Sequence, residues 1–208
     1  MPAFYNRYLA AGYALNFALS ANPQWIRDSV TDCTNFISQA LYFGGWPMTA
    51  GAGNDDITAW YNTGDDSPWL EGFARSSYRR SRSWGAAQNF RRYLTVSGRA
   101  RPCKLAELTI GDVVQHVGPN GEAHHTMMIT GSMPPDATNH STGNLHGKVL
   151  LASYHSRDRR NYPLELHVPP AGDNLFWKIL DSVPDTESQT DAILEDRVSQ
   201  RWSHSLSR

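Results

Sequence analysis

The chain has 208 residues, of which 40% are hydrophobic and 19% charged, and its formal net charge is -1. This length allows one well-packed domain or two small ones. The nearly neutral charge gives no electrostatic basis for binding nucleic acid or an anionic membrane. No apolar stretch is long enough for a membrane span. We therefore expect a globular protein with no nucleic-acid partner and no membrane span.

The N-terminal part shows two helical patterns. Apolar residues recur near helical spacing from residue 4 to about residue 20, and Asn22-Pro23 ends the pattern. A second helix is predicted from Cys33 to Phe43, with Gly44-Gly45 as its end. The expected buried residues of the first helix are Phe4, Tyr5, Tyr8, Leu9, Tyr13 and Phe17, and those of the second are Phe36, Ile37, Ala40 and Leu41.

The first helix also bears on localisation. Polar residues such as Asn6 and Arg7 interrupt its apolar pattern, and no basic region precedes an uninterrupted apolar core. We therefore predict a folded helix and no signal peptide. The protein is expected to be cytoplasmic as made, and any export would use a specialised secretion system.

Residues 46–72 are rich in Gly, Asp, Asn, Thr and Pro, and they predict a long excursion with little regular structure. A third helix is predicted over residues 83–96. Tryptophans occur around this region at Trp46, Trp60 and Trp84. They are candidates for lining a substrate cleft, although each one alone is more typical of core packing.

The second half changes to strand-like patterns. Two short runs, 110–117 and 125–131, flank Pro119-Asn120-Gly121 and predict a hairpin. Further strands are expected at Leu145–Ser156, Leu164–Pro169 and Leu175–Leu180, and a surface helix is expected over 186–202. Helices followed by an antiparallel sheet make an α+β fold. We divide the chain into a domain at 1–182 and a polar tail at 183–208.

Cys33 is a candidate nucleophile because it falls at the predicted start of a helix. Unpaired N–H groups and the helix dipole stabilise a thiolate there, and the same groups can hold an oxyanion. Asp32 is a good N-cap residue type, and Asn35 and Gln39 can supply supporting hydrogen bonds. The alternative is an ordinary buried thiol. Cys103 shows no sign of activation and is interpreted as structural.

A cysteine nucleophile needs a base, for which histidine is the usual residue. His125 opens one predicted strand and His155 ends another, so adjacent antiparallel strands would bring both to one sheet edge. His124 is the rival of His125; alternation along a strand would allow only one of the two to meet the thiol. No HxxxH or HxH pair occurs on a defined element, and we expect no metal and no cofactor.

The sequence resembles a known family at these residues. DCTNFISQAL followed by GG, a Trp-rich stretch and SW, then LTIGDVVQHV, HHTMMITG and YHSRDRRNYPL, is similar to the bacterial putative amidase domain. That family is placed with the NlpC-type, papain-like cysteine peptidases and their CHAP relatives. The resemblance covers most of residues 4–167. It implies a papain-like fold, with the cysteine helix packed on a small antiparallel sheet.

The resemblance also implies roles for residues. Cys33 would be the nucleophile, His125 the general base, and His155 the polar third member that orients His125. The implied activity is hydrolysis of amide bonds through a thioester, with peptidoglycan peptides as the expected substrate.

An antibacterial effector delivered by a secretion machine, with an immunity or delivery protein as partner, would fit the missing signal peptide. Three alternatives stay open. The first is hydrolysis or deamidation of an intracellular protein or small amide. The second is acyl transfer by the same thioester route, and the third is a non-catalytic binding module on the same fold.

Overall fold

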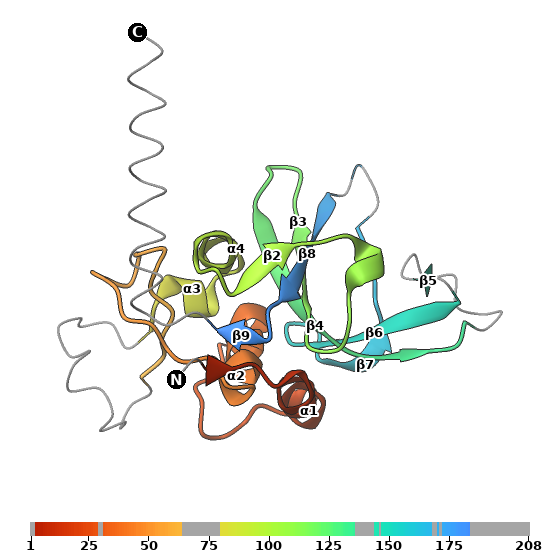
Figure 1. Cartoon of the computed structure of the whole chain (residues 1–208), viewed down its shortest axis with the longest axis horizontal. Coiled ribbons are helices and arrows are strands. Elements are labelled where there is room, and N and C mark those ends of the chain that lie inside the picture. Colours follow the sequence, from red (N-terminus) through yellow and green to blue (C-terminus); the bar gives the residue numbers. More distant parts are fainter. Residues whose placement is uncertain are drawn as a thin grey trace, which may run out of the picture.

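The computed structural model describes residues 3–28, 31–63, 80–135, 144–145, 147–167, 170 and 172–183. These residues form an α+β fold in which helices pack beside a small antiparallel sheet (Figure 1). The helices are α1 (Arg7–Phe17), α2 (Cys33–Phe43), α3 (Arg82–Gly85) and α4 (Ala87–Val96), and a 3-10 helix covers Leu105–Glu107.

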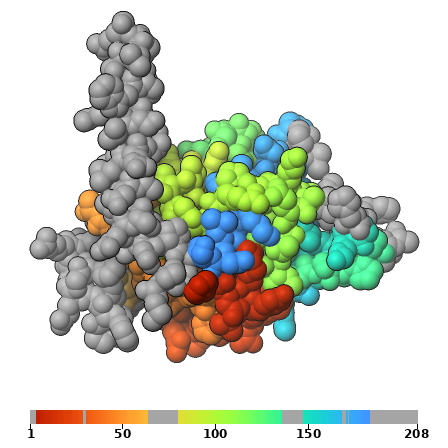
Figure 2. All heavy atoms as spheres, in the orientation of Figure 1, coloured from red at the N-terminus to blue at the C-terminus, as the bar shows by residue number. Residues whose placement is uncertain are grey.

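The described strands form two antiparallel sheets. The larger has the order β2-β8-β3-β4-β6-β5, and β7 also pairs with β6. Its strands are β2 (Ala100–Pro102), β3 (Val113–Val117), β4 (Ala123–Met133), β5 (Asn144–Leu145), β6 (Lys148–Tyr154), β7 (Arg159–Pro163) and β8 (Asp173–Ile179). The smaller sheet pairs β1 (Ala3–Phe4) with β9 (Ser182–Val183), so segments near the two ends of the chain lie side by side (Figure 2).

The helix predictions hold with corrections. The second helix has the predicted bounds. The first starts later, because the Asn6 side chain accepts hydrogen bonds from the N–H groups of Tyr8 and Leu9 and thereby caps α1. Tyr8 and Leu9 are exposed, contrary to the predicted buried face. The third predicted helix is two helices, α3 and α4, because the backbone is extended at Ala86.

The strand predictions are partly right. The β3–β4 hairpin is confirmed, and so is the strand at 175–180, which is part of β8. The predicted strand over 145–156 is present as β5 and β6. Residues 164–167 are not strand, whereas β7 begins five residues earlier, at Arg159. The predicted tail helix over 186–202 lies outside the described residues.

Helix α2 is the most buried helix of the described fold. Every residue from Cys33 to Leu41 is buried, because α2 packs against α1, α3 and the sheet. Phe36, Ile37 and Leu41 are fully buried, and each such side chain contributes about 1.5–3 kcal/mol from the hydrophobic effect. The first turn of α2 is therefore held in a fixed position.

No helix among the described residues is long and apolar enough to cross a membrane.

Candidate active site

Cys33 is the first residue of α2, and only 5% of it is exposed. The residue before it, Asp32, is the N-cap residue, but its side chain makes no capping hydrogen bond to the helix. The first-turn N–H groups beside the thiol are therefore not occupied by a capping carboxylate, and they favour negative charge at this position. The Cys33 sulfur lies 3.8 Å from Thr34 Oγ1.

The Asp32 carboxylate turns instead to the sheet. Its Oδ2 accepts a hydrogen bond from His155 Nδ1, at the end of β6. Its Oδ1 accepts from Asn35 Nδ2 at 2.7 Å and from the backbone N–H of Asp28 at 2.9 Å. Burial acts to raise the pKa of Asp32, but the hydrogen bonds from His155, Asn35 and Asp28 outweigh it and hold that pKa below its ordinary value.

Both ring nitrogens of His155 are hydrogen-bonded, and its ring packs against another ring. Its Nε2 lies 2.8 Å from the carbonyl oxygen of Phe17, and its ring stacks on Phe36 with centroids 3.9 Å apart. A carbonyl and a carboxylate both accept hydrogen bonds, so neither ring nitrogen of His155 is left to accept a proton from another group. The expected contact of His155 with His125 is not formed. His155 instead anchors the residue that precedes Cys33.

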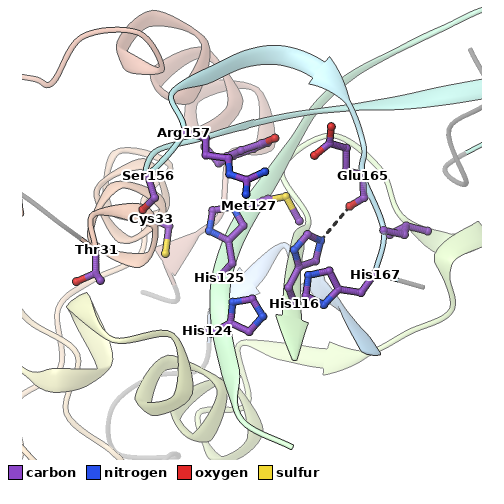
Figure 3. Close-up of a pocket in the computed structure, with 12 residues that line it drawn as sticks. Thr31, Cys33, His116, His124, His125, Met127, Ser156, Arg157, Glu165 and His167 are labelled. Carbon is purple, nitrogen blue, oxygen red and sulfur yellow. Dashed lines mark hydrogen bonds between the residues drawn. The ribbon is translucent and has the colours of Figure 1, made fainter. Parts of the chain in front are cut away.

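A cavity of about 610 Å³ opens at the first turn of α2 (Figure 3). The figure shows the Cys33 sulfur and the rings of four histidines around one space. The lining residues are Thr31, Cys33, His116, His124, His125, Met127, Tyr154, Ser156, Arg157, Glu165, Leu166 and His167. Cys33 and His125, the predicted nucleophile and base, are thus brought to the same cavity.

His124 and His125 both line this cavity because β4 contains a bulge. His116 of β3 pairs with His125, whereas the next residue, Val117, pairs with Ala123, so His124 is an extra residue on β4. A bulge interrupts the alternation of side chains. The expected alternation of the two side chains is therefore broken at the bulge, and both histidines line the cavity; which of them meets the thiol stays a prediction.

His125 is the better placed base in chemical terms. Its pKa is lowered to about 3, chiefly by burial and to a smaller extent by the nearby His116, His124, Arg157 and His167. The ring is therefore neutral at physiological pH. Its ring makes no hydrogen bond to any of the residues described, and its nearest aromatic contact is an edge contact with Tyr154, with centroids 5.0 Å apart. A neutral imidazole with an uncommitted nitrogen can accept a proton, but a pKa this low makes the free ring a weak base, and a thiolate beside it would raise that pKa.

His116 and His167 form the far wall of the cavity. Their rings stack with centroids 4.0 Å apart, and His116 Nε2 donates a hydrogen bond to the Glu165 carbonyl oxygen at 2.9 Å. Burial lowers the pKa of His116 to about 4, although the bond to Glu165 acts in the opposite direction. Stacked rings do not point their nitrogens at one centre. In the part of the chain that is described, no three His, Cys, Asp or Glu side chains are arranged to hold a metal ion.

A family model for the putative amidase domain matches residues 4–176 of the chain. The match includes α1, Cys33, the strands β3, β4 and β6 that contribute to the cavity lining, and most of β8. The chain belongs to the putative amidase domain family. No curated protein and no solved structure matches the chain. Membership in this family indicates hydrolysis of amide bonds.

The tryptophans of this amidase domain do not line the cavity. Trp46, Trp60 and Trp84 are fully buried in the core behind α2. Trp84 Nε1 donates to Asn35 Oδ1 at 2.9 Å, and Trp60 Nε1 donates to Ser38 Oγ at 3.1 Å. The prediction of a tryptophan-lined cleft is therefore wrong, and these rings hold the helix that carries Cys33.

Two of the predicted supporting residues of the amidase domain have the same structural role. Asn35 bonds to Asp32, to Trp84 and to the carbonyl oxygen of Ile26. Gln39 Oε1 accepts from the Tyr13 hydroxyl at 2.7 Å. Both are buried and directed into the core, so the structure places neither at the cavity. They brace α2 and are not oxyanion donors.

Several lining residues of the amidase domain were missed from sequence. Tyr154 and Arg157 flank His155 in the YHSRD stretch, which was interpreted through its histidine alone. His116 was assigned no catalytic role. His167 belongs to a run predicted as strand, and it folds back beside His116. The available signal was that all eight histidines of the chain lie in its second half.

Proposed function

We propose that this amidase is a cysteine hydrolase that acts through a thioester acyl-enzyme, with Cys33 as nucleophile and His125 as general base. The observation that supports it best is that Cys33, at the uncapped first turn of α2, lines the same cavity as the neutral ring of His125. A papain-like fold of the NlpC and CHAP type is part of the proposal, supported by the order of the cysteine helix and the histidine strand.

The reaction follows from these two groups. His125 accepts the thiol proton, and the Cys33 thiolate attacks the amide carbonyl carbon. The backbone N–H of Cys33 and a second donor hold the oxyanion. His125 then donates its proton to the leaving amine as the C–N bond breaks. In the second half, His125 takes a proton from water, hydroxide attacks the thioester, and the carboxylic acid leaves as the thiol is restored.

The proposed substrate is the peptide part of peptidoglycan. A cavity of about 610 Å³ is within the size range of sites that enclose a small ligand or a short peptide segment. We propose further that the protein acts as an antibacterial effector, delivered by a secretion machine and neutralised by an immunity protein. The sequence resemblance supports the peptidoglycan substrate.

The test is mass spectrometry of purified peptidoglycan after incubation with the wild-type protein, Cys33→Ala and Cys103→Ala. The wild type and Cys103→Ala should release the same new peptide ends, and Cys33→Ala should release none. Circular dichroism of all three proteins checks that the fold is kept. Release of the same products by folded Cys33→Ala would refute the cysteine mechanism.

The effector part has its own test, which is growth of bacteria expressing the protein with and without a fused periplasmic signal. Toxicity only with the signal supports a cell-wall substrate. Toxicity without it overturns that substrate in favour of an intracellular amide. Absence of toxicity in both cases overturns the effector role and leaves the hydrolase chemistry to the peptidoglycan assay.

A further inference from the structure

Arg157 brings a positive charge to the cavity. It lies in the turn between β6 and β7 and lines the cavity with Cys33 (Figure 3). Among the residues described, no carboxylate forms an ion pair with it. Glu165 is the lining residue that carries a carboxylate, and it is not paired with Arg157. The guanidinium is therefore available to a ligand.

The turn that carries Arg157 is held at both ends. On one side, His155 is bound to Asp32. On the other side, Asp158 accepts two hydrogen bonds from Arg27 Nη2, at 2.7 and 2.8 Å. Arg27 and Asp32 both belong to the segment that leads into Cys33. The position of Arg157 is thus tied to the position of the nucleophile.

The backbone conformation of the turn is an unfavourable one that the surrounding structure must hold in place. Ser156 has φ 79° and Asp158 has φ 38°, in the left-handed region that non-glycine residues rarely adopt. Such conformations cost of order 1–2 kcal/mol each and persist where the surrounding structure fixes them. Here the two anchors, Asp32 and Arg27, supply that constraint. A relaxed turn would not hold Arg157 against the cavity.

The surroundings of Arg157 favour a bound anion. Four histidines face the same space, His116, His124, His125 and His167, and they add donors without adding carboxylates. Glu165 is the opposing charge. A guanidinium presents two parallel N–H donors that match the two oxygens of a carboxylate, and Arg157 is an exposed residue of the cavity lining that a ligand can reach.

We propose that Arg157 binds a carboxylate of the substrate, so that the enzyme acts on amides that carry a free carboxylate beside the scissile bond. The proposal rests on the hydrolase function proposed above and adds the substrate class. It requires that a carboxylate near the Cys33 sulfur be attracted by Arg157.

Two alkylating reagents of nearly equal size test this without knowledge of the substrate. Iodoacetate carries a carboxylate where iodoacetamide carries a neutral amide, and both alkylate the Cys33 sulfur with loss of iodide. Rates at Cys33 are measured by peptide mass spectrometry for the wild type, Arg157→Gln and the control Arg160→Gln. Arg160 is exposed and does not line the cavity. Cys103 serves as an internal reference because burial raises its pKa to about 11.

Arg157→Gln should lower the rate with iodoacetate about tenfold and change the rate with iodoacetamide less than about twofold. Arg160→Gln should change neither rate by more than about twofold. Glu165→Gln should raise the iodoacetate rate, because it removes the opposing charge.

Equal slowing of both reagents in Arg157→Gln would overturn the proposal, since Arg157 would then act on the thiol and not on the carboxylate. Unchanged rates, or exclusion of iodoacetate from Cys33 in the wild type, would also overturn it, and the hydrolase proposal would stand. If neither iodoacetate nor iodoacetamide alkylated Cys33 in the wild type, both this proposal and the hydrolase proposal would be overturned.

Discussion

His155 and His125, the two histidines predicted to act with Cys33, have very different surroundings in the fold. His155 is 1% exposed, with one ring nitrogen bonded to Asp32 and the other to Phe17. His125 also lies close to the first turn of α2, but its ring has no hydrogen-bond partner among the residues described. A fully bonded ring can brace a structure, and an unbonded ring can move a proton. The contrast separates the framework of the site from its chemistry.

The largest effect on stability should come from removing the hydrogen bond between His155 and Asp32. His155→Asn removes the imidazole that hydrogen-bonds the buried Asp32 carboxylate, so we expect a loss of about 3–5 kcal/mol in the free energy of unfolding. Urea unfolding followed by tryptophan fluorescence measures it. The double variant with Asp32→Asn should lose much less than the sum of the two single variants. Additive losses would show that the two residues are not coupled.

The chemical side should show the opposite behaviour. His125→Asn should lower kcat/KM for peptidoglycan cleavage by about 10²–10⁴-fold, as expected for loss of a general base. Its free energy of unfolding should change by less than about 1 kcal/mol, because no hydrogen bond is lost. The matched control His124→Asn, on the bulge, should lower kcat/KM by less than about tenfold. A larger effect at His124 than at His125 would reverse their assignment.

Acid should weaken the fold through the cavity histidines. The pKa of His125 is lowered to about 3 and that of His116 to about 4, whereas an unfolded chain protonates histidine near its ordinary value of 6.5. Below that value the unfolded state binds more protons, so stability falls as the pH falls.

Between pH 7.5 and 5 we expect a loss of roughly 2–3 kcal/mol in the free energy of unfolding, discounted for solvent reaching the cavity. Urea unfolding at both pH values measures it. The pKa of Asp32 is held below its ordinary value, so Asp32 itself stays ionised across this window. The variant His116→Asn/His125→Asn should lose most of the dependence, and an unchanged slope would contradict this origin.

The smallest of these effects concerns the tryptophans behind α2. Trp84→Phe removes one hydrogen bond, from Trp84 Nε1 to Asn35 Oδ1, and some buried ring area. We expect a loss of about 1–2 kcal/mol in the free energy of unfolding and a change in kcat/KM of less than about threefold. Thermal unfolding and the cleavage assay measure the two quantities. A strong loss of activity at unchanged stability would return Trp84 to the substrate cleft.

The sequence predicted well what depends on local chain properties. The bounds of α2 follow from an apolar helical pattern between a possible N-cap and Gly44-Gly45, and the structure has the same bounds. The β3–β4 hairpin follows from Pro119-Asn120-Gly121, where Gly121 adopts φ 76°. The presence of Cys33 and His125 at one cavity follows from the positions of those two elements.

What the sequence did not predict depends on contacts between distant residues. His155 and Asp32 are 123 positions apart, and no local pattern shows that a histidine at a strand end will bind the N-cap carboxylate of another element. The bulge at His124 is set by the pairing register with β3, which alternation alone does not reveal. Tryptophan is a residue type that can line a cleft or fill a core. Only the packing of α2 shows that Trp46, Trp60 and Trp84 belong to the core.

The pairing of β1 with β9 has a mechanical consequence. The chain enters and leaves the described fold through two neighbouring antiparallel segments, Ala3–Phe4 and Ser182–Val183. A pulling force applied to these two segments would unzip their short ladder one hydrogen bond at a time, before any load reached the larger sheet or α2. A module joined to its surroundings in this way can be spliced into a loop of another polypeptide with little distortion of either partner.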